Sequence, residues 1–248
     1  LSTFGQVTKL DVTIPEGTTP GAAKKTAVAT NADGVALVKK VQEFAGGSAK
    51  LATVKGTRTH ANMNRKTPQG DMAIEVDSIV EYPDRTHTVM KTPMGEVTRV
   101  STPDAGFVLT PMGAQDLPSS QREEAKKDMG TDFISILSNT SNPSYTFTSA
   151  GTEKIGDVSA QIVEIGAGGS TVKWWIDPAT GRLLRKSQQV RGPQPGEAIS
   201  EYTEWKNFSG VNLPVKMKTS MNGEQIGTME VSSIEINPTV DPTMYKKP

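Results

Sequence analysis

The sequence contains no cysteine. Disulfides, thiolate nucleophiles and cysteine-ligated metals are therefore excluded, whereas the redox compartment stays open. Long apolar runs are also lacking: none approaches the roughly 18 residues that a membrane-spanning helix needs, and no basic-then-apolar signal peptide opens the chain. Net charge is lacking too, because 27 Lys and Arg balance 27 Asp and Glu. This balance disfavours nucleic acid and anionic membrane surfaces as partners.

Catalytic motifs are scarce as well. The two histidines, His60 and His87, each lie in a Thr-rich strand-like run, without the second histidine at helical spacing that many zinc sites use. No G-x-S-x-G elbow occurs, and the glycine-rich run 166–169 lacks the further glycine and the helix of a dinucleotide fingerprint. The acidic residues of 75–81 share one strand face, which favours a solvated surface over a carboxylate pair for glycoside hydrolysis. The sequence therefore predicts a protein that is not an enzyme and needs no metal or cofactor.

Turn-forming residues are abundant instead. Gly occurs 23 times and Pro 16 times, which is typical of a globular protein with many short strands. After residue 54 the apolar residues alternate with period two, most regularly in 71–82. The tetrapeptide Thr-Pro-x-Gly occurs at 67–70, 92–95 and 110–113, where proline presets one turn dihedral and glycine accepts a positive φ. These features predict an antiparallel meander.

Helical patterns interrupt the strands twice. An apolar stripe over 33–44 predicts an amphipathic helix with Asp33 as its N-cap. The stretch 117–140 breaks the period-two pattern, and 118–124 indicates a capped helix start. A second, shorter apolar stripe follows at Phe133, Ile134 and Leu137.

Residues 1–30 differ in composition from the rest. Their first half alternates like a strand, and the small, polar residues after Pro15 are typical of a linker. We expect 1–30 to be the tail of a preceding domain and a linker, and 31–248 to form one β-domain with a helical insertion near 117–140. The chain begins without methionine, from which we expect a fragment or a processed form, with any export signal upstream.

Two hairpins are predicted in the C-terminal half. The apolar run Trp174–Ile176 leads into an Asp-Pro-x-Thr-Gly turn at 177–181, and a second hairpin turns at Asn222-Gly223. In its return strand the apolar phase slips between Thr228 and Met229, which predicts a bulge. Because bulges bend sheets, we expect a strongly curved sheet.

Three C-terminal motifs and the order of elements carry a family resemblance. The motifs are Ile-Asp-Pro-x-Thr-Gly at 176–181, Gly-x-x-Leu-Pro at 210–214 and Ile-Asn-Pro…Asp-Pro at 236–242. With the N-terminal helix, the meander and the helical insertion, residues 31–248 resemble the outer-membrane lipoprotein-sorting family, which has the LolA/LolB-like fold. The resemblance implies an α+β, mostly antiparallel fold: a curved, unclosed β-barrel with helices covering the concave face. It also implies lipid or lipoprotein acyl chains as ligands and a periplasmic or cell-envelope location. The lipobox cysteine of a membrane-anchored acceptor is absent.

Methionine is unusually frequent, with ten residues against six Phe. Flexible thioethers adapt to ligands of varied shape, but they also fill irregular cores, so both interpretations stay open. Each buried methylene is worth roughly 0.8 kcal/mol, so a chain of about sixteen carbons offers on the order of 12 kcal/mol before association costs. We expect a hydrophobic small molecule or a lipoprotein acyl chain to bind without a charged contact. The expected cavity wall consists of Leu37, Val41, Met72, Ile74, Val76, Met90, Met112, Phe133, Leu137, Trp174 and Met217.

An alternative function is a structural or interaction module. The opening residues are foreign to a free periplasmic carrier, and modules of this type are similar to those found behind insulinase-like zinc peptidase domains. In that case a sheet edge or an exposed aromatic such as Trp175 would contact the partner. Any peptidase activity would then belong to the upstream domain.

Overall fold

Antiparallel strands form one large sheet. The computed structural model describes residues 30–190 and 195–248, and the 13 strands of this part lie in the order β6-β5-β4-β3-β2-β1-β13-β12-β11-β10-β9-β8-β7. Neighbours in the sheet are also neighbours in the chain, except at one seam, where β1 pairs with β13. Among the described residues, β6 and β7 are the two ends of the sheet order and do not pair with each other, so the sheet is not closed into a barrel. The strands are β1 Gly56–Thr67, β2 Gly70–Glu81, β3 Arg85–Thr92, β4 Gly95–Ser101, β5 Gly106–Thr110, β6 Gly113–Asp116, β7 Tyr145–Ile155, β8 Val158–Ala167, β9 Ser170–Ile176, β10 Leu183–Val190, β11 Gly196–Phe208, β12 Val211–Met221 and β13 Glu224–Ile236.

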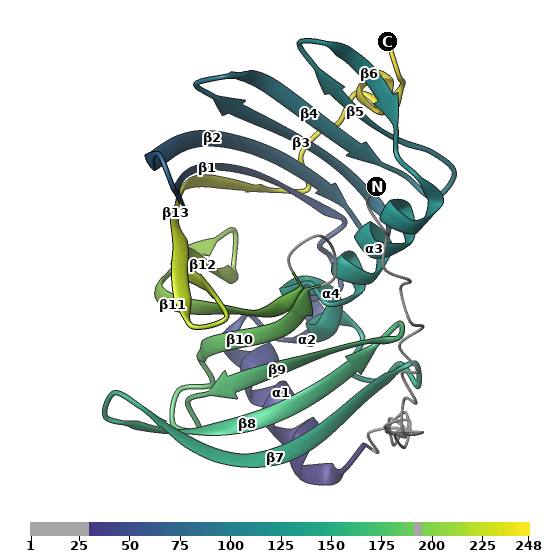
Figure 1. Ribbon diagram of the computed structural model, residues 1–248. Coiled ribbons are helices and arrows are strands. Elements are labelled where there is room, and N and C mark those ends of the chain that lie inside the picture. Colours follow the sequence, from purple (N-terminus) through teal and green to yellow (C-terminus); the bar gives the residue numbers. More distant parts are fainter. Residues whose placement is uncertain (1–29, 191–194) are drawn as a thin grey trace, which may run out of the picture.

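The sheet is bent into a C (Figure 1). Strands β1–β6 form its first arm and β7–β11 its second arm, and β12 and β13 lie at the bend. The helices are α1 Ala32–Phe44, α2 Ser48–Leu51, α3 Ser119–Gly130 and α4 Phe133–Ser138. This architecture confirms the expected α+β fold, a curved and unclosed antiparallel sheet with helices on its concave side.

The second arm and the helices share the main core. Val172, Trp174 and Ile176 alternate along β9 and point to the same face, as the period of two requires. Helix α1 packs on β7 and β8, and α4 packs on α1 and α2. Burial of each such aliphatic side chain contributes about 1.5–3 kcal/mol. The core also contains Leu37, Val38, Val41, Ala45, Leu51, Val54, Ile134, Ile136, Leu137, Phe147, Val163, Ile165, Leu183, Val211 and Leu213.

The N-cap of helix α1 lies two residues before the expected one. Asn31, not Asp33, is the N-cap, and its Oδ1 accepts a hydrogen bond from the Gly34 N–H at 2.7 Å. The prediction of Asp33 was wrong because Asn31 also fits β7: its N–H donates to the Phe147 carbonyl at 2.9 Å, and its Oδ1 accepts from the Ser149 N–H at 3.2 Å. One side chain therefore starts the helix and fixes it to the edge strand.

Helices α3 and α4 separate β6 from β7. Helix α3 begins at Ser119 after Pro118, and no side chain caps it, so the expected capped start at 118–124 was wrong in that respect. Met129 is its only buried residue. Helix α4 has a strong cap, because the Asp132 carboxylate accepts from the backbone N–H groups of Ile134 and Ser135. The polar helix α3 therefore has fewer buried residues than α4 and lacks the side-chain cap that α4 has.

The Thr-Pro-x-Gly motifs form the turns β1–β2, β3–β4 and β5–β6, which lie along one end of the first arm (Figure 1). In each turn the threonine hydroxyl donates to the glycine carbonyl, and the glycine has a positive φ.

The bulge expected between Thr228 and Met229 was misplaced. Strand β13 changes register at 225–227 against β12 and at 231–233 against β1.

The C-terminal residues cross the outer face of the first arm. After β13 a 3-10 helix, η1, spans Pro242–Tyr245, and the Tyr245 ring meets His87 edge-to-face with 6.5 Å between ring centroids. Lys247 Nζ then reaches the Asp116 carboxylate on β6 at 2.9 Å. The end of the chain therefore contacts the outermost strand of this arm.

The tail and linker expected at the N-terminus lie outside the described residues, apart from Thr30.

Candidate functional site

A pocket of about 240 Å³ lies between the start of α4 and the bend of the sheet. Its walls come from the inner faces of β1 and β9–β13, so residues from both sides of the β1–β13 seam meet there. The α4 residues lie opposite this sheet surface. The apolar lining consists of Phe133, Ile134, Trp174, Leu183, Leu213, Pro214, Met217, Met229, Val231 and Ile234.

Apolar side chains continue from this pocket onto the first arm. Directly paired residues of neighbouring strands point to the same face, so the strand register identifies two inner rows. The first row is Met217, Met229, Met63 and Ile74, across β12, β13, β1 and β2. The second row is Val231, Ala61, Val76, Met90 and Val97, across β13 and β1–β4. At about 4.8 Å between strands, the second row is roughly 19 Å long.

A polar cluster lies on the other side of the pocket. The Tyr82 hydroxyl donates to Asp132 Oδ2 at 2.8 Å, and the same oxygen accepts from the α4 backbone. Lys186 Nζ, on β10, donates to the Thr131 carbonyl at 3.0 Å. The Tyr202 hydroxyl, on β11, has no hydrogen-bond partner among the described residues. This cluster therefore holds more donors than the protein itself satisfies.

Burial determines the protonation states in this polar cluster. Burial raises the pKa of Tyr82 and of Tyr202, and the Asp132 carboxylate raises both further. Burial lowers the pKa of Lys186, while Asp132 and Asp128 act in the opposite direction. Both phenols thus remain neutral hydrogen-bond donors at ordinary pH.

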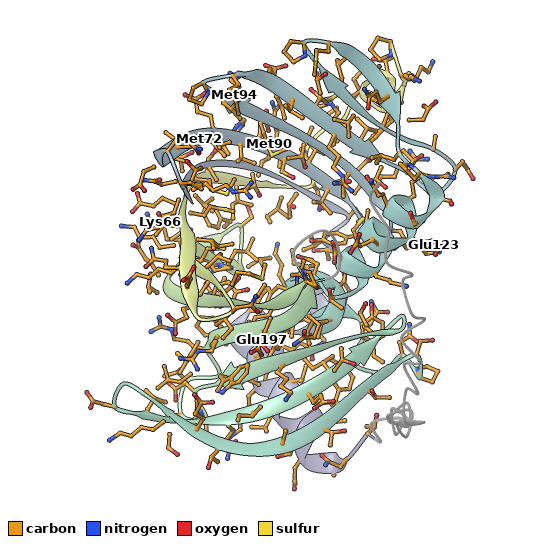
Figure 2. The ribbon with its side chains drawn as sticks, viewed as in Figure 1. Lys66, Met72, Met90, Met94, Glu123 and Glu197 are labelled. Atoms are coloured by element: carbon orange, nitrogen blue, oxygen red, sulfur yellow. The ribbon has the colours of Figure 1, made fainter. Side chains whose placement is uncertain are left out.

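The expected wall residues fall into three groups. Phe133, Trp174 and Met217 line the pocket. Ile74, Val76 and Met90 belong to the two inner rows, and Met72 faces the same way beside them, opposite Arg65. Figure 2 shows Met72 and Met90 on their strands and Met94 at the β3–β4 turn.

Four expected wall residues lie elsewhere. Leu37, Val41 and Leu137 are sealed in the main core, where they hold α1 and α4 on the second arm. Met112 lies in the β5–β6 turn with 93% of its surface exposed, so its placement on a cavity wall was wrong. A residue at position three of a Thr-Pro-x-Gly turn points away from the sheet, whatever its hydrophobicity.

The sequence interpretation missed the residues that the seam brings together. Met63, Met229 and Val231 come from β1 and β13, whose pairing joins segments far apart in the chain. The alternation of apolar and polar residues along β1 is weak because threonines and asparagines occupy much of the strand. The polar members of the site, Asp132 and Lys186, gave no signal beyond their charge.

Trp175 does not offer the expected exposed aromatic surface. It points to the outer face, but its side chain is covered by Arg185, whose guanidinium carbon lies 5.6 Å from the ring centroid. Its indole N–H donates to Glu153 Oε2 at 2.7 Å. Trp175 therefore lies on the outer face with its indole N–H hydrogen-bonded and its ring covered.

Within residues 30–190 and 195–248, no three His, Asp or Glu side chains form a group that could hold a metal ion. In that part, too, no helix combines the length and apolarity needed to cross a bilayer.

The open, C-shaped sheet with helices inside it and an apolar pocket at the bend defines a LolA-like fold. Solved structures that share this fold include a LolA superfamily protein from Nitrosomonas europaea, with a TM-score of 0.59, 13% identity and coverage of 86% of this chain and 97% of that one. A putative outer membrane lipoprotein-sorting protein domain from Vibrio parahaemolyticus matches with a TM-score of 0.57 and 11% identity, over 86% of this chain and 96% of its own. A DUF1329 family protein from Desulfovibrio piger matches with a TM-score of 0.58 and 11% identity, over 85% and 96%. No protein-family model and no curated protein matches the sequence.

Proposed function

We propose that this protein binds the acyl chain of a lipid or lipoprotein in the pocket and along the two inner rows, within the bacterial periplasm or cell envelope. The observation that carries the proposal is the continuity of apolar side chains from the pocket across β13 and β1–β4. The rows contain no charged residue. A hydrocarbon chain laid across the strands would contact apolar atoms along its length.

The energetics support a chain rather than a compact ligand. About twelve methylenes would contribute roughly 10 kcal/mol of gross burial, from which association costs of several kcal/mol are subtracted. The methionines of the first row, Met217, Met229 and Met63, can change rotamer to follow chains of different length. The Vibrio parahaemolyticus structure is that of a putative outer membrane lipoprotein-sorting protein domain, which agrees with a ligand of this class.

The test is uptake of the neutral fluorophore N-phenyl-1-naphthylamine and its displacement by acyl chains. Met217→Glu places a carboxylate in the pocket, and covering that charge with hydrocarbon is costly. We expect at least about tenfold weaker binding of the fluorophore, which corresponds to about 1.4 kcal/mol. Met112→Glu is the matched control, because the same substitution in the exposed turn leaves the pocket unchanged.

Circular dichroism of both variants separates misfolding from lost binding. Mass spectrometry of a solvent extract of the purified protein provides an independent measurement. Absence of saturable uptake by the wild type, together with no extracted lipid, would contradict the proposal. Equal losses in Met217→Glu and Met112→Glu would contradict the assignment of the pocket.

A further inference from the structure

Unused hydrogen-bond donors gather on three adjacent strands of the pocket. Lys186 on β10 pairs with Trp174 on β9, and with Ser200 on β11. Tyr202 lies two residues beyond Ser200, so it is a diagonal neighbour of Lys186 on the same face. All three side chains, Trp174, Lys186 and Tyr202, line the pocket.

These donors are only partly satisfied by the described protein atoms. The Lys186 ammonium has three N–H groups, and one hydrogen bond is formed, to the Thr131 carbonyl at 3.0 Å. The buried Trp174 indole N–H has no partner among the described residues. Tyr202 lines the pocket, and its hydroxyl makes no hydrogen bond to another described residue. Since buried donors without acceptors are costly, the arrangement favours a ligand that brings an acceptor oxygen.

The cations around these donors already have carboxylates as neighbours. The electrostatic neighbours of Lys186 are Asp132 and Asp128. Asp128 is in turn influenced by Glu124, which opposes its ionisation, and by Lys186 and Arg99, which favour it. No cation is left over for a ligand carboxylate, which would instead meet Asp132 in a buried setting. A carbonyl oxygen accepts the same hydrogen bonds without adding charge.

Resting on the proposed acyl-chain function, we propose that the pocket selects acyl groups in neutral form, with an ester or amide carbonyl hydrogen-bonded by Lys186 and Tyr202, over free fatty acids. The carbonyl end lies at the polar cluster of the pocket. The hydrocarbon follows the inner rows onto the first arm. The ligand class is therefore an acyl ester or acyl amide, such as a glycerolipid or an acylated polypeptide carries.

The test compares three competitors of equal chain length for displacement of N-phenyl-1-naphthylamine: methyl dodecanoate, dodecanoate and dodecane. With the wild type we expect the methyl ester to displace the fluorophore at roughly tenfold lower concentration than dodecanoate. We also expect it to be several-fold more effective than dodecane, the difference that a hydrogen bond makes. N-methyl dodecanamide, added as a fourth competitor, extends the comparison to amides.

Variants link this preference to the named donors. Tyr202→Phe keeps the ring and removes the hydroxyl, so affinity for the ester falls roughly three- to tenfold while that for dodecane is unchanged. Tyr245→Phe, on the outer face, is the matched control and leaves both unchanged. Asp132→Asn retains an N-cap residue for α4 and frees the Lys186 charge, so the preference shifts toward dodecanoate.

The outcomes separate the two proposals. If none of the competitors displaces the fluorophore, the acyl-chain function itself fails. If dodecanoate competes as well as the ester, or if Tyr202→Phe weakens dodecane as much as the ester, acyl binding stands and the carbonyl selection is overturned.

Discussion

Arg58 and Asp77 face each other across β1 and β2 on the outer side of the first arm. Arg58 Nε lies 3.1 Å from Asp77 Oδ1, and Nη2 lies 2.7 Å from Oδ2. The Arg58 hydrogen bond holds the pKa of Asp77 below its ordinary value, against the opposing effect of burial. The pKa of Asp77 is lower in the folded state than in the unfolded state. The stabilisation that the Arg58–Asp77 pair gives the folded protein is therefore fully present above the unfolded-state pKa, and it is lost as the pH falls through the folded-state pKa.

Asp77→Asn tests this pair. Both side chains are about a third exposed, 39% and 30%, so solvent screening limits the expected loss at pH 7 to about 0.5–1 kcal/mol. Urea unfolding from pH 7 down to pH 2 should show the two proteins converging below about pH 4, where Asp begins to protonate. The exposed Glu75–Lys91 pair, with its atoms 3.7 Å apart, supplies the control Glu75→Gln, for which no change is expected. A constant difference at all pH values would contradict the ion-pair explanation.

Gly34 is a second residue whose role follows from geometry. A Cβ at this position would lie 2.5 Å from the Phe147 carbonyl oxygen, so Gly34→Ala must push α1 away from β7. We expect a loss of about 1–3 kcal/mol in unfolding free energy. Gly130→Ala is the matched helical control, because its Cβ would be 3.9 Å from the nearest atom, the Tyr145 hydroxyl oxygen. Similar stabilities of the two variants would show that α1 does not need this close approach.

Residue type alone predicted some positions and missed others. Trp174 and Met217 line the pocket, on the face of their strands that alternation along the sequence indicates. Asp33 and Asn31 are both good caps, and only the contact with β7 favours Asn31, so the sequence could not choose between them. Met112 shows that the turn motif around a residue predicts its position better than its hydrophobicity does.

Among the elements, α3 stands apart from the other helices. Only Met129 is buried, and a hydrogen bond from Arg122 to the Asp104 carbonyl at 2.8 Å ties the helix to the first arm. A polar helix with few apolar contacts opens at low free energy. We expect the amides of α3 to exchange with deuterium orders of magnitude faster than those of α1, as measured by mass spectrometry of proteolytic peptides. Equal protection of the two helices would contradict this weak attachment.

Elements with a strong local pattern were predictable. The Thr-Pro-x-Gly turns and the apolar stripe of α1 are local features, and each appears close to its expected position. The bulges of β13 were not predictable in position, because they depend on which residues of β1 and β12 lie opposite. Local chemistry thus specified the elements, whereas their mutual register depended on tertiary contacts.

For the whole molecule, the resemblance predicted an open sheet with helices inside it, and the sheet order confirms this. The composition of the pocket could not be derived in the same way. Two of its walls meet only because β1 and β13 pair, and nothing in either strand identifies the other as its partner. Pairing over such a sequence distance is specified by the packing of the complete fold.

This seam has a consequence for how the protein matures. Strands β1–β6 and β7–β12 can each assemble by successive local hairpins as they emerge from a ribosome or a translocon, but β13 is made last. Joining distant segments carries a large loop-closure entropy and is slow compared with hairpin formation. Because Thr57 and Met229 line the pocket from opposite sides of the seam, a nascent or C-terminally truncated chain that lacks β13 has no complete pocket, and the proposed ligand site forms only with this strand.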